Sequence, residues 1–192
     1  MEIENLQNPD IRRLSDMKDI VFDKDWAESA GDKELYYMYR GIKSEGDLRY
    51  DITVIPALLM GKEFVKTKGH YHLNGSQEVY SVLEGRAFFL FQKGEDEIED
   101  VYAVPASKGE SVIIPSGYGH ITINPDAEAA LKLSNWINKN SIADYGPIED
   151  KKGACYFYTT AGWIKNDNYK SVPELRFEQP LSREPEDLRF LK

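Results

Sequence analysis

The chain has 192 residues, of which 41% are hydrophobic, so it is long enough to bury a core and most simply forms one domain. Its 33 acidic residues outnumber the 24 basic ones, and the resulting net charge of −9 argues against a nucleic-acid partner. Apolar runs such as AFFLF fall far short of the roughly 20 residues that a membrane-spanning helix needs, so we expect no membrane partner.

Residues 1–50 are polar and mixed in character, and we expect them to form an arm that packs on the body of the protein. Within this range, the stretch SDMKDIVFDKDWAES begins at Ser15 and predicts a short helix. The first residues, MEIENLQNPDIRR, contain no basic segment leading into an apolar one, so no secretory signal is expected. The single cysteine, Cys155, excludes an internal disulfide and suits a reducing compartment, which predicts a cytoplasmic protein with an inert, buried thiol.

From residue 51 onward, short runs rich in Val, Ile, Phe and Tyr alternate with Gly, Pro, Asn and Asp, which is typical of antiparallel strands. The stretch VLEGRAF predicts a tight hairpin turning at Gly85. In the last part of the chain, residues 154–165 and residues 168–177 are expected to form another strand pair, followed by a charged tail. We therefore predict a mainly all-β protein with a few short helices, built as a β-barrel or jelly roll.

Two of the three histidines, His70 and His72, lie one residue apart. Side chains two positions apart in a strand point to the same face, so these two imidazoles are expected to converge. The connection LNGSQ suits a hairpin turn, which would bring Glu78 back beside His72, with Tyr80 on the same face as Glu78.

The third histidine, His120, follows the turn residues PSG and begins the alternating stretch HITIN, so it can point into a barrel from another strand. Three imidazoles and one carboxylate leave open positions on a six-coordinate divalent ion, and these donors suit Fe(II), Mn, Ni or Zn. A His-x-His pair alone is weak support for a metal site, because most histidines are ordinary hydrogen-bonded residues. The carboxylate at hairpin spacing and the third histidine make the complete set much more specific.

The motifs HYHLNGSQEVYSVLEG and GESVIIPSGYGHITIN resemble the two conserved motifs of the cupin superfamily, although the gap before Glu78 is five residues rather than three or four. This resemblance implies a cupin jelly-roll barrel over residues 1–192, with an arm (1–50), a motif-bearing barrel core (51–146) and C-terminal strands with a tail (147–192). The fold by itself does not define an activity.

Together with LSDMKDIVFD and DYG, these motifs resemble the archaeal-type, cupin-fold glucose-6-phosphate isomerases, most strongly over residues 50–146. That resemblance implies a cytoplasmic, homodimeric enzyme of glycolysis and gluconeogenesis, with one divalent metal ion per subunit, iron first among the candidates. It also implies roles for individual residues: metal ligands at His70, His72, Glu78 and His120, phosphate contacts at Thr53, Thr67 and Gly69, and an active-site tyrosine at Tyr80.

The sequence departs from this family in one region. Some members add a tyrosine and a histidine to the phosphate pocket after the second motif, and those places fall near Trp136 and Ala143 here, with Tyr145 close but shifted. The resemblance therefore does not define the far wall of the phosphate pocket.

Isomerisation of an aldose to a ketose moves a hydrogen between C1 and C2, by proton transfer through an enediol or by a hydride shift, and the sequence leaves both routes open. Glu78 is the candidate base, but ligation to a metal ion would lower its basicity. Tyr80 could donate to a sugar oxygen or simply pack inside the barrel. Two other functions stay open, namely an iron dioxygenase that uses the same ligand set and a non-catalytic sugar-binding cupin.

Overall fold

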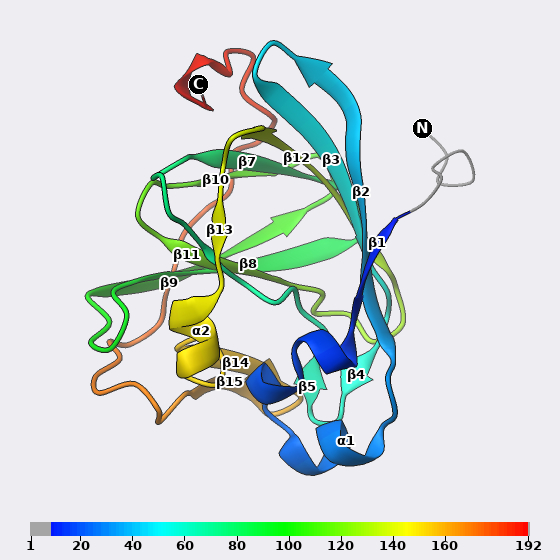
Figure 1. Ribbon diagram of the computed structural model, residues 1–192, viewed down its shortest axis with the longest axis vertical. Helices are drawn as coiled ribbons and strands as arrows, with labels where there is room; N and C mark the ends of the chain where they lie inside the picture. The colour runs from blue at the N-terminus through cyan, green and yellow to red at the C-terminus, as the bar shows by residue number, and fades with distance from the viewer. Residues whose placement is uncertain (1–8, 192) are drawn as a thin grey trace.

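A six-stranded antiparallel sheet, here called the first sheet, forms one wall of the molecule. The computed structural model describes residues 9–191. In the first sheet the strands follow the order β1-β2-β3-β12-β7-β10, and β2 and β3 run side by side as the longest neighbours (Figure 1). Their bounds are Asp10–Arg13 (β1), Glu34–Glu45 (β2), Leu48–Ile55 (β3), Leu131–Asn138 (β12), Glu78–Glu84 (β7) and Ser111–Ile114 (β10).

The second sheet has four strands in the order β11-β8-β9-β16, and its last strand runs parallel to β9. The bounds of these strands are Gly119–Ile123 (β11), Arg86–Lys93 (β8), Asp100–Ser107 (β9) and Arg176–Phe177 (β16). Strand β8 is buried on both sides, because Phe89 and Phe91 face the main core while Leu90 packs into a separate cluster with Ile121 and Cys155. This double burial explains why its sequence is a continuous apolar run instead of an alternating one.

The main core lies between the two sheets. It contains buried side chains from both, among them Ile55 and Leu133 of the first sheet and Phe89 and Val104 of the second. Two mainly antiparallel sheets packed face to face around one core, with only short helices, confirm the predicted fold class, a mainly β barrel.

Short elements close the ends of the barrel. A four-stranded sheet has the order β15-β14-β5-β4, and β13 pairs with β6. Helix α1, with Asp23 as its N-cap, lies close to β4 and β5 at the lower end in Figure 1, where α2 and the β14–β15 pair also lie. The bounds are Leu14–Asp16 (η2), Lys18–Ile20 (η3), Lys24–Ser29 (α1), Leu59–Met60 (β4), Glu63–Phe64 (β5), Tyr71–His72 (β6), Ala143–Asp144 (β13), Gly146–Asp150 (α2), Tyr156–Thr159 (β14), Gly162–Lys165 (β15) and Arg189–Leu191 (η4).

The hairpin predicted at Gly85 is wrong. Strand β7 pairs with β12 and β10 in the first sheet, whereas β8 pairs with β11 and β9 in the second, so Gly85 lies where the chain crosses from one sheet to the other. Its φ of +79° and the position of the Ala130 carbonyl oxygen, 2.8 Å from where a Cβ would stand, require glycine at this corner.

Two other pairings differ from the sequence prediction. The turn after His72 does not form a hairpin between β6 and β7, because β6 pairs with β13 instead. The C-terminal hairpin forms within residues 154–165, between β14 and β15, while residues 168–177 contribute β16 to the second sheet. After His72 the turn was recognised but the strand partner was not, whereas the C-terminal turn between Thr159 and Gly162 lies inside a stretch that was predicted as one strand.

The division into an N-terminal arm, a barrel core and a C-terminal part stays a prediction, and residues 1–8 of that arm lie outside the described residues. Within residues 9–50, the expected helical stretch forms η2, η3 and α1, and β2 is a member of the first sheet. Across residues 9–191, no helix has both the length and the apolar character that crossing a membrane requires.

Candidate metal centre and the cavity around it

The three histidines come together because two distant segments pair through their backbones. His70 and His120 form an isolated antiparallel bridge, in which the His120 amide donates to the His70 carbonyl oxygen at 3.0 Å and the His70 amide donates to that of His120 at 3.2 Å. His72 lies in β6, two residues further on, and its ring centroid is 5.3 Å from that of His120. The bridge therefore brings all three rings to one place.

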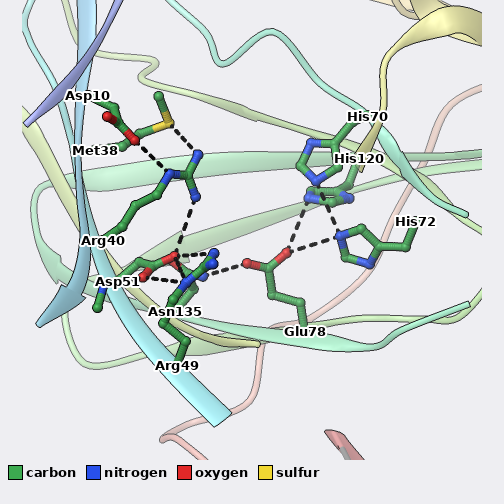
Figure 2. A network of polar contacts seen from close by, with 11 residues as sticks. Asp10, Met38, Arg40, Arg49, Asp51, His70, His72, Glu78, His120 and Asn135 are labelled. Carbon is green, nitrogen blue, oxygen red and sulfur yellow. Dashed lines mark hydrogen bonds and ion pairs between the residues drawn. The ribbon is translucent and has the colours of Figure 1, made fainter. Parts of the chain in front are cut away.

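Glu78, the first residue of β7, completes the cluster (Figure 2). Its Oε2 atom is 3.6 Å from Nε2 of His72 and 3.5 Å from Nε2 of His120, and the Nε2 atoms of His70 and His72 are 3.2 Å apart. One ligand atom from each of the four residues lies within 4.8 Å of the other three. Within residues 9–191, Glu78 Oε2 and both ring nitrogens of His120 are buried and have no hydrogen-bond partner.

Burial decides the protonation of these groups. Removal from bulk water, with the other imidazoles as a smaller contribution, lowers the pKa of His70 to about 3 and that of His120 well below its ordinary value. Burial also lowers the pKa of His72, against a hydrogen bond to the Ser76 carbonyl that raises it. All three rings are therefore neutral near pH 7 and offer lone pairs to a cation.

The carboxylate behaves in the opposite way. Burial raises the pKa of Glu78 to about 8, and hydrogen bonding with Tyr80 offsets only part of this. A nearby divalent cation would favour the ionised form and reverse the shift. The imidazoles are neutral, and the carboxylate oxygen that faces them has no hydrogen-bond partner. Both features fit a metal ion bound among these four residues.

Two hydrogen bonds reach the ligand side chains from outside the cluster. The Nδ1 atom of His72 lies 2.7 Å from the Ser76 carbonyl oxygen and donates to it as the neutral tautomer, which leaves Nε2 to face the cluster. On the other side, Nδ2 of Asn135 donates to Oε1 of Glu78 at 2.6 Å. The remaining carboxylate oxygen, Oε2, is the one that faces the histidines.

A cavity of about 240 Å³ opens beside this cluster, and all the residues expected in the site line it. Thr53 of β3 and Tyr80 of β7 lie on the wall formed by the first sheet, and Thr67 and Gly69 lie on the segment that leads into His70. The ring centroids of Tyr80 and His120 are 6.2 Å apart. The sequence-predicted metal, phosphate and tyrosine positions are thus brought together around one space.

Gly69 explains how Thr67 and His70 reach the same cavity although strict alternation would place them on opposite faces. Its φ is +77°, and a Cβ at this position would stand 2.3 Å from Cγ1 of Ile121. The backbone bends at Gly69, while Thr67 Oγ1 accepts a hydrogen bond from the Thr122 amide at 3.0 Å. This segment therefore lies directly against β11, which carries His120.

Ala143 and Tyr145 also line the cavity, together with Tyr36 of β2. The Tyr145 ring centroid is 5.5 Å from that of His70. Trp136 does not line the cavity and instead packs edge-on against Tyr50 in a small cluster beside the first sheet. A tyrosine therefore contributes to the lining of the cavity, but at the position two residues after Ala143.

The polar residues of the cavity wall that sequence reasoning missed include Arg40, Arg49, Asp51 and Asn135. Asp51 is 2% exposed and is paired with both arginines, through Arg49 Nη2 at 2.8 Å and Arg40 Nη1 at 3.5 Å (Figure 2). The alternation of Arg49, Asp51 and Thr53 along β3 placed all three on one face. Because Thr53 was already expected at the site, this alternation was a signal that could have identified Arg49 and Asp51, whereas Arg40 and Asn135 lie on other strands.

Comparison with known proteins identifies the family. A family model described as Glucose-6-phosphate isomerase (GPI) matches residues 11–174. Relatives named glucose-6-phosphate isomerase include one from Thermococcus litoralis, 35% identical over 78% of this chain and 79% of its own, and one from Thermococcus gammatolerans, 34% identical over 73% of this chain and 75% of its own.

A solved structure of a cupin-2 domain containing protein from Shewanella frigidimarina has a TM-score of 0.37 and 19% identity over 52% of this chain and 78% of that one, too low a similarity to support a conclusion. The family model and the sequence relatives carry the assignment. The chain belongs to the glucose-6-phosphate isomerase family of enzymes.

Proposed function

We propose that this chain is a metal-dependent aldose–ketose isomerase that interconverts glucose 6-phosphate and fructose 6-phosphate. The observation that carries the proposal is the convergence of three neutral imidazoles and one carboxylate in the same cavity as Thr53, Thr67 and Gly69. Family membership supports the isomerase reaction, and the ligand set supports its dependence on a metal ion.

In this proposal His70, His72, Glu78 and His120 hold one divalent ion per subunit. Imidazole and carboxylate donors suit Fe(II), and also Ni, Mn or Zn, with iron as our first choice. Such an ion, when bound by these residues, would supply Lewis-acid stabilisation for the sugar carbonyl and for the negative charge that develops on its oxygen. The Ser76 carbonyl oxygen accepts a hydrogen bond from His72, and the Asn135 amide donates one to Glu78.

The transfer of hydrogen between C1 and C2 involves the residues nearest the cluster. Glu78 is the candidate base, but its Oε2 faces the histidines, so one carboxylate would have to serve as a ligand and as a base. Tyr80 keeps its proton, because burial and the adjacent carboxylate raise its pKa well above the ordinary value. A protonated phenol is suited to donate a hydrogen bond to a sugar oxygen.

The charges that line the cavity explain how an acidic protein could attract an anionic sugar. With Glu78 ionised, as it would be on binding a metal ion, Arg40 and Arg49 formally cancel Asp51 and Glu78, so the side chains of the wall are together neutral. A divalent ion would make it positive, which favours a phosphorylated substrate despite the net charge of −9. The phosphate itself would be held by the hydroxyls of Thr53 and Thr67 and by the backbone near Gly69.

Several broader statements belong to the same proposal. We infer that the enzyme is a cytoplasmic homodimer acting in glycolysis and gluconeogenesis, and that residues 1–192 form a single domain. Family membership supports the metabolic role. Sedimentation velocity on the purified protein would test the dimer directly.

A coupled assay tests the main proposal. Purified protein loaded with Fe, Ni or Mn should convert fructose 6-phosphate to glucose 6-phosphate, and EDTA should abolish the conversion. The variants His72→Ala and His120→Ala should each lose the metal ion and the activity, measured by elemental analysis and by the same assay. An active, metal-free His120→Ala protein would refute the assignment.

The same preparation separates the alternative functions. An iron dioxygenase would consume oxygen, so isomerisation that proceeds unchanged under argon excludes it as the main activity. A sugar-binding cupin would retain its ligand without converting it. Running the reaction in D₂O addresses the route, since deuterium at C2 of the glucose 6-phosphate formed favours proton transfer and its absence favours a hydride shift.

A further inference from the structure

Asn135 occupies a rigid position in the wall of the cavity. It lies on β12, between β3 and β7 in the first sheet, and is in register with Asp51 on one side and Tyr80 on the other. Its side chain is 5% exposed and lines the cavity. A side chain on a strand that is hydrogen-bonded along both edges holds its position more accurately than one on a loop.

The Asn135 amide forms a hydrogen bond with only one of the two carboxylate oxygens of Glu78. Its Nδ2 donates to Oε1 at 2.6 Å, and Glu78 itself is 2% exposed (Figure 2). In the described part of the chain, Oε2 has no hydrogen-bond partner and lies 3.5 and 3.6 Å from the Nε2 atoms of His120 and His72. One oxygen is therefore satisfied by the protein, and the other is directed at the imidazoles.

We propose that Asn135 is a positioning residue, which holds the Glu78 carboxylate in the orientation that presents Oε2 to the metal ion. The inference rests on the proposed function, because it concerns the same metal centre. Carboxylate ligands of metals are commonly hydrogen-bonded by neighbouring groups, and loss of such a group typically lowers metal affinity by about 10- to 100-fold.

The amide of Asn135 restricts rotation of the Glu78 carboxylate about its terminal bond. Without a donor at Oε1, both oxygens would compete for the same imidazole-rich space, and the buried carboxylate could turn about its terminal bond. A purely structural asparagine would also fill this space, but its loss would then leave metal binding unchanged. Metal affinity therefore distinguishes the two roles.

The test compares Asn135→Leu, which keeps a similar volume and removes the amide, with Ser134→Ala on the same strand. Ser134 is buried, and within residues 9–191 its hydroxyl has no hydrogen-bond partner, so the control perturbs β12 without changing a polar contact. Co²⁺ affinity is measured by competition with a chromogenic chelator. We expect about a 10- to 100-fold loss for Asn135→Leu and wild-type affinity for Ser134→Ala.

The absorption spectrum of the Co²⁺-loaded protein provides a second readout, because d–d bands respond to ligand geometry. The bands should shift in Asn135→Leu and stay unchanged in Ser134→Ala. If Asn135→Leu does not fold, Asn135→Ser removes the amide with less crowding and is expected to lose affinity in the same way. A folded Asn135 variant with wild-type affinity and spectrum would overturn the inference.

The outcome also separates this inference from the proposed function. If the wild-type protein binds neither Co²⁺ nor Fe, the metal centre itself is wrong, whatever the variants do. If the wild-type protein binds the ion and Asn135→Leu binds it equally well, only the role of Asn135 is wrong.

Discussion

Replacing Gly69 by alanine tests how the site is assembled, because this glycine combines two constraints. Its φ of +77° lies in the left-handed region, and the new Cβ would stand 2.3 Å from Cγ1 and 2.9 Å from Cδ1 of Ile121. Both atoms belong to the side chain that follows His120 on β11. The substitution should therefore strain the backbone and push the segment carrying His70 away from the strand carrying His120.

The backbone strain and the steric overlap each have their own cost in the free energy of unfolding. An alanine in the left-handed conformation costs about 1–2 kcal/mol. Overpacking a buried contact costs typically about 1–3 kcal/mol more. We therefore expect Gly69→Ala to lower the free energy of unfolding by about 2–5 kcal/mol.

Gly31 provides the matched control, since its φ is +69° and nothing lies within 4 Å of the position of its Cβ. Gly31→Ala should lower the free energy of unfolding by the backbone part alone, about 1–2 kcal/mol. Urea denaturation of the two variants and the wild type measures both values, with coincident transitions by fluorescence and circular dichroism as a check on two-state behaviour. Metal affinity should fall for Gly69→Ala and stay unchanged for Gly31→Ala. Equal destabilisation by the two substitutions would refute the packing argument.

Three further predictions concern buried charges and the cavity. Lys66→Met removes the cation paired with the fully buried Glu63 and should lower the free energy of unfolding, measured in urea, by about 3–5 kcal/mol. Adding Glu63→Gln should recover most of this loss, and equal values for the single and double variants would contradict the prediction. In the metal-free protein, the Glu78 pKa of about 8 lies above its ordinary value of 4.5, so the stability this group contributes is fully present below pH 4.5 and is lost as the pH rises through 8. Wild type should therefore become less stable relative to Glu78→Gln over that range, and a difference independent of pH would argue against the shift. Tyr80→Phe should lower kcat/KM about tenfold at unchanged metal affinity if the hydroxyl donates to the sugar, and an unchanged kcat/KM would indicate that Tyr80 only packs.

The strand content and the fold class were predictable from the sequence, whereas several pairings were not. Turn residues such as those around Gly85 mark where the chain changes direction, but they do not identify the strand beside which it continues. At Gly85 the chain crosses between sheets, and at Asn74 it turns toward β7 while β6 pairs with β13. Strand partners are selected by contacts between segments that are distant in the chain, which local patterns do not contain.

For the site, the spacing of His70, His72 and Glu78 predicted their convergence correctly, although through a turn and not through a paired hairpin. His120 was identified through its own motif, and it reaches the cluster through the backbone bridge to His70. Arg40 and Asp51 were missed because charged residues on a strand usually face solvent.

The sequence by itself determined the chemistry available to this protein, because the three histidines, the carboxylate and the glycine that bends the chain are defined by residue type and short spacing. Only the tertiary structure decided which groups surround them. Asn135 is 57 residues from Glu78 in the chain and lies beside it because β12 pairs with β7. A hydrogen bond across two strands depends on their register, and that register is determined by the packing of the whole sheet against the core.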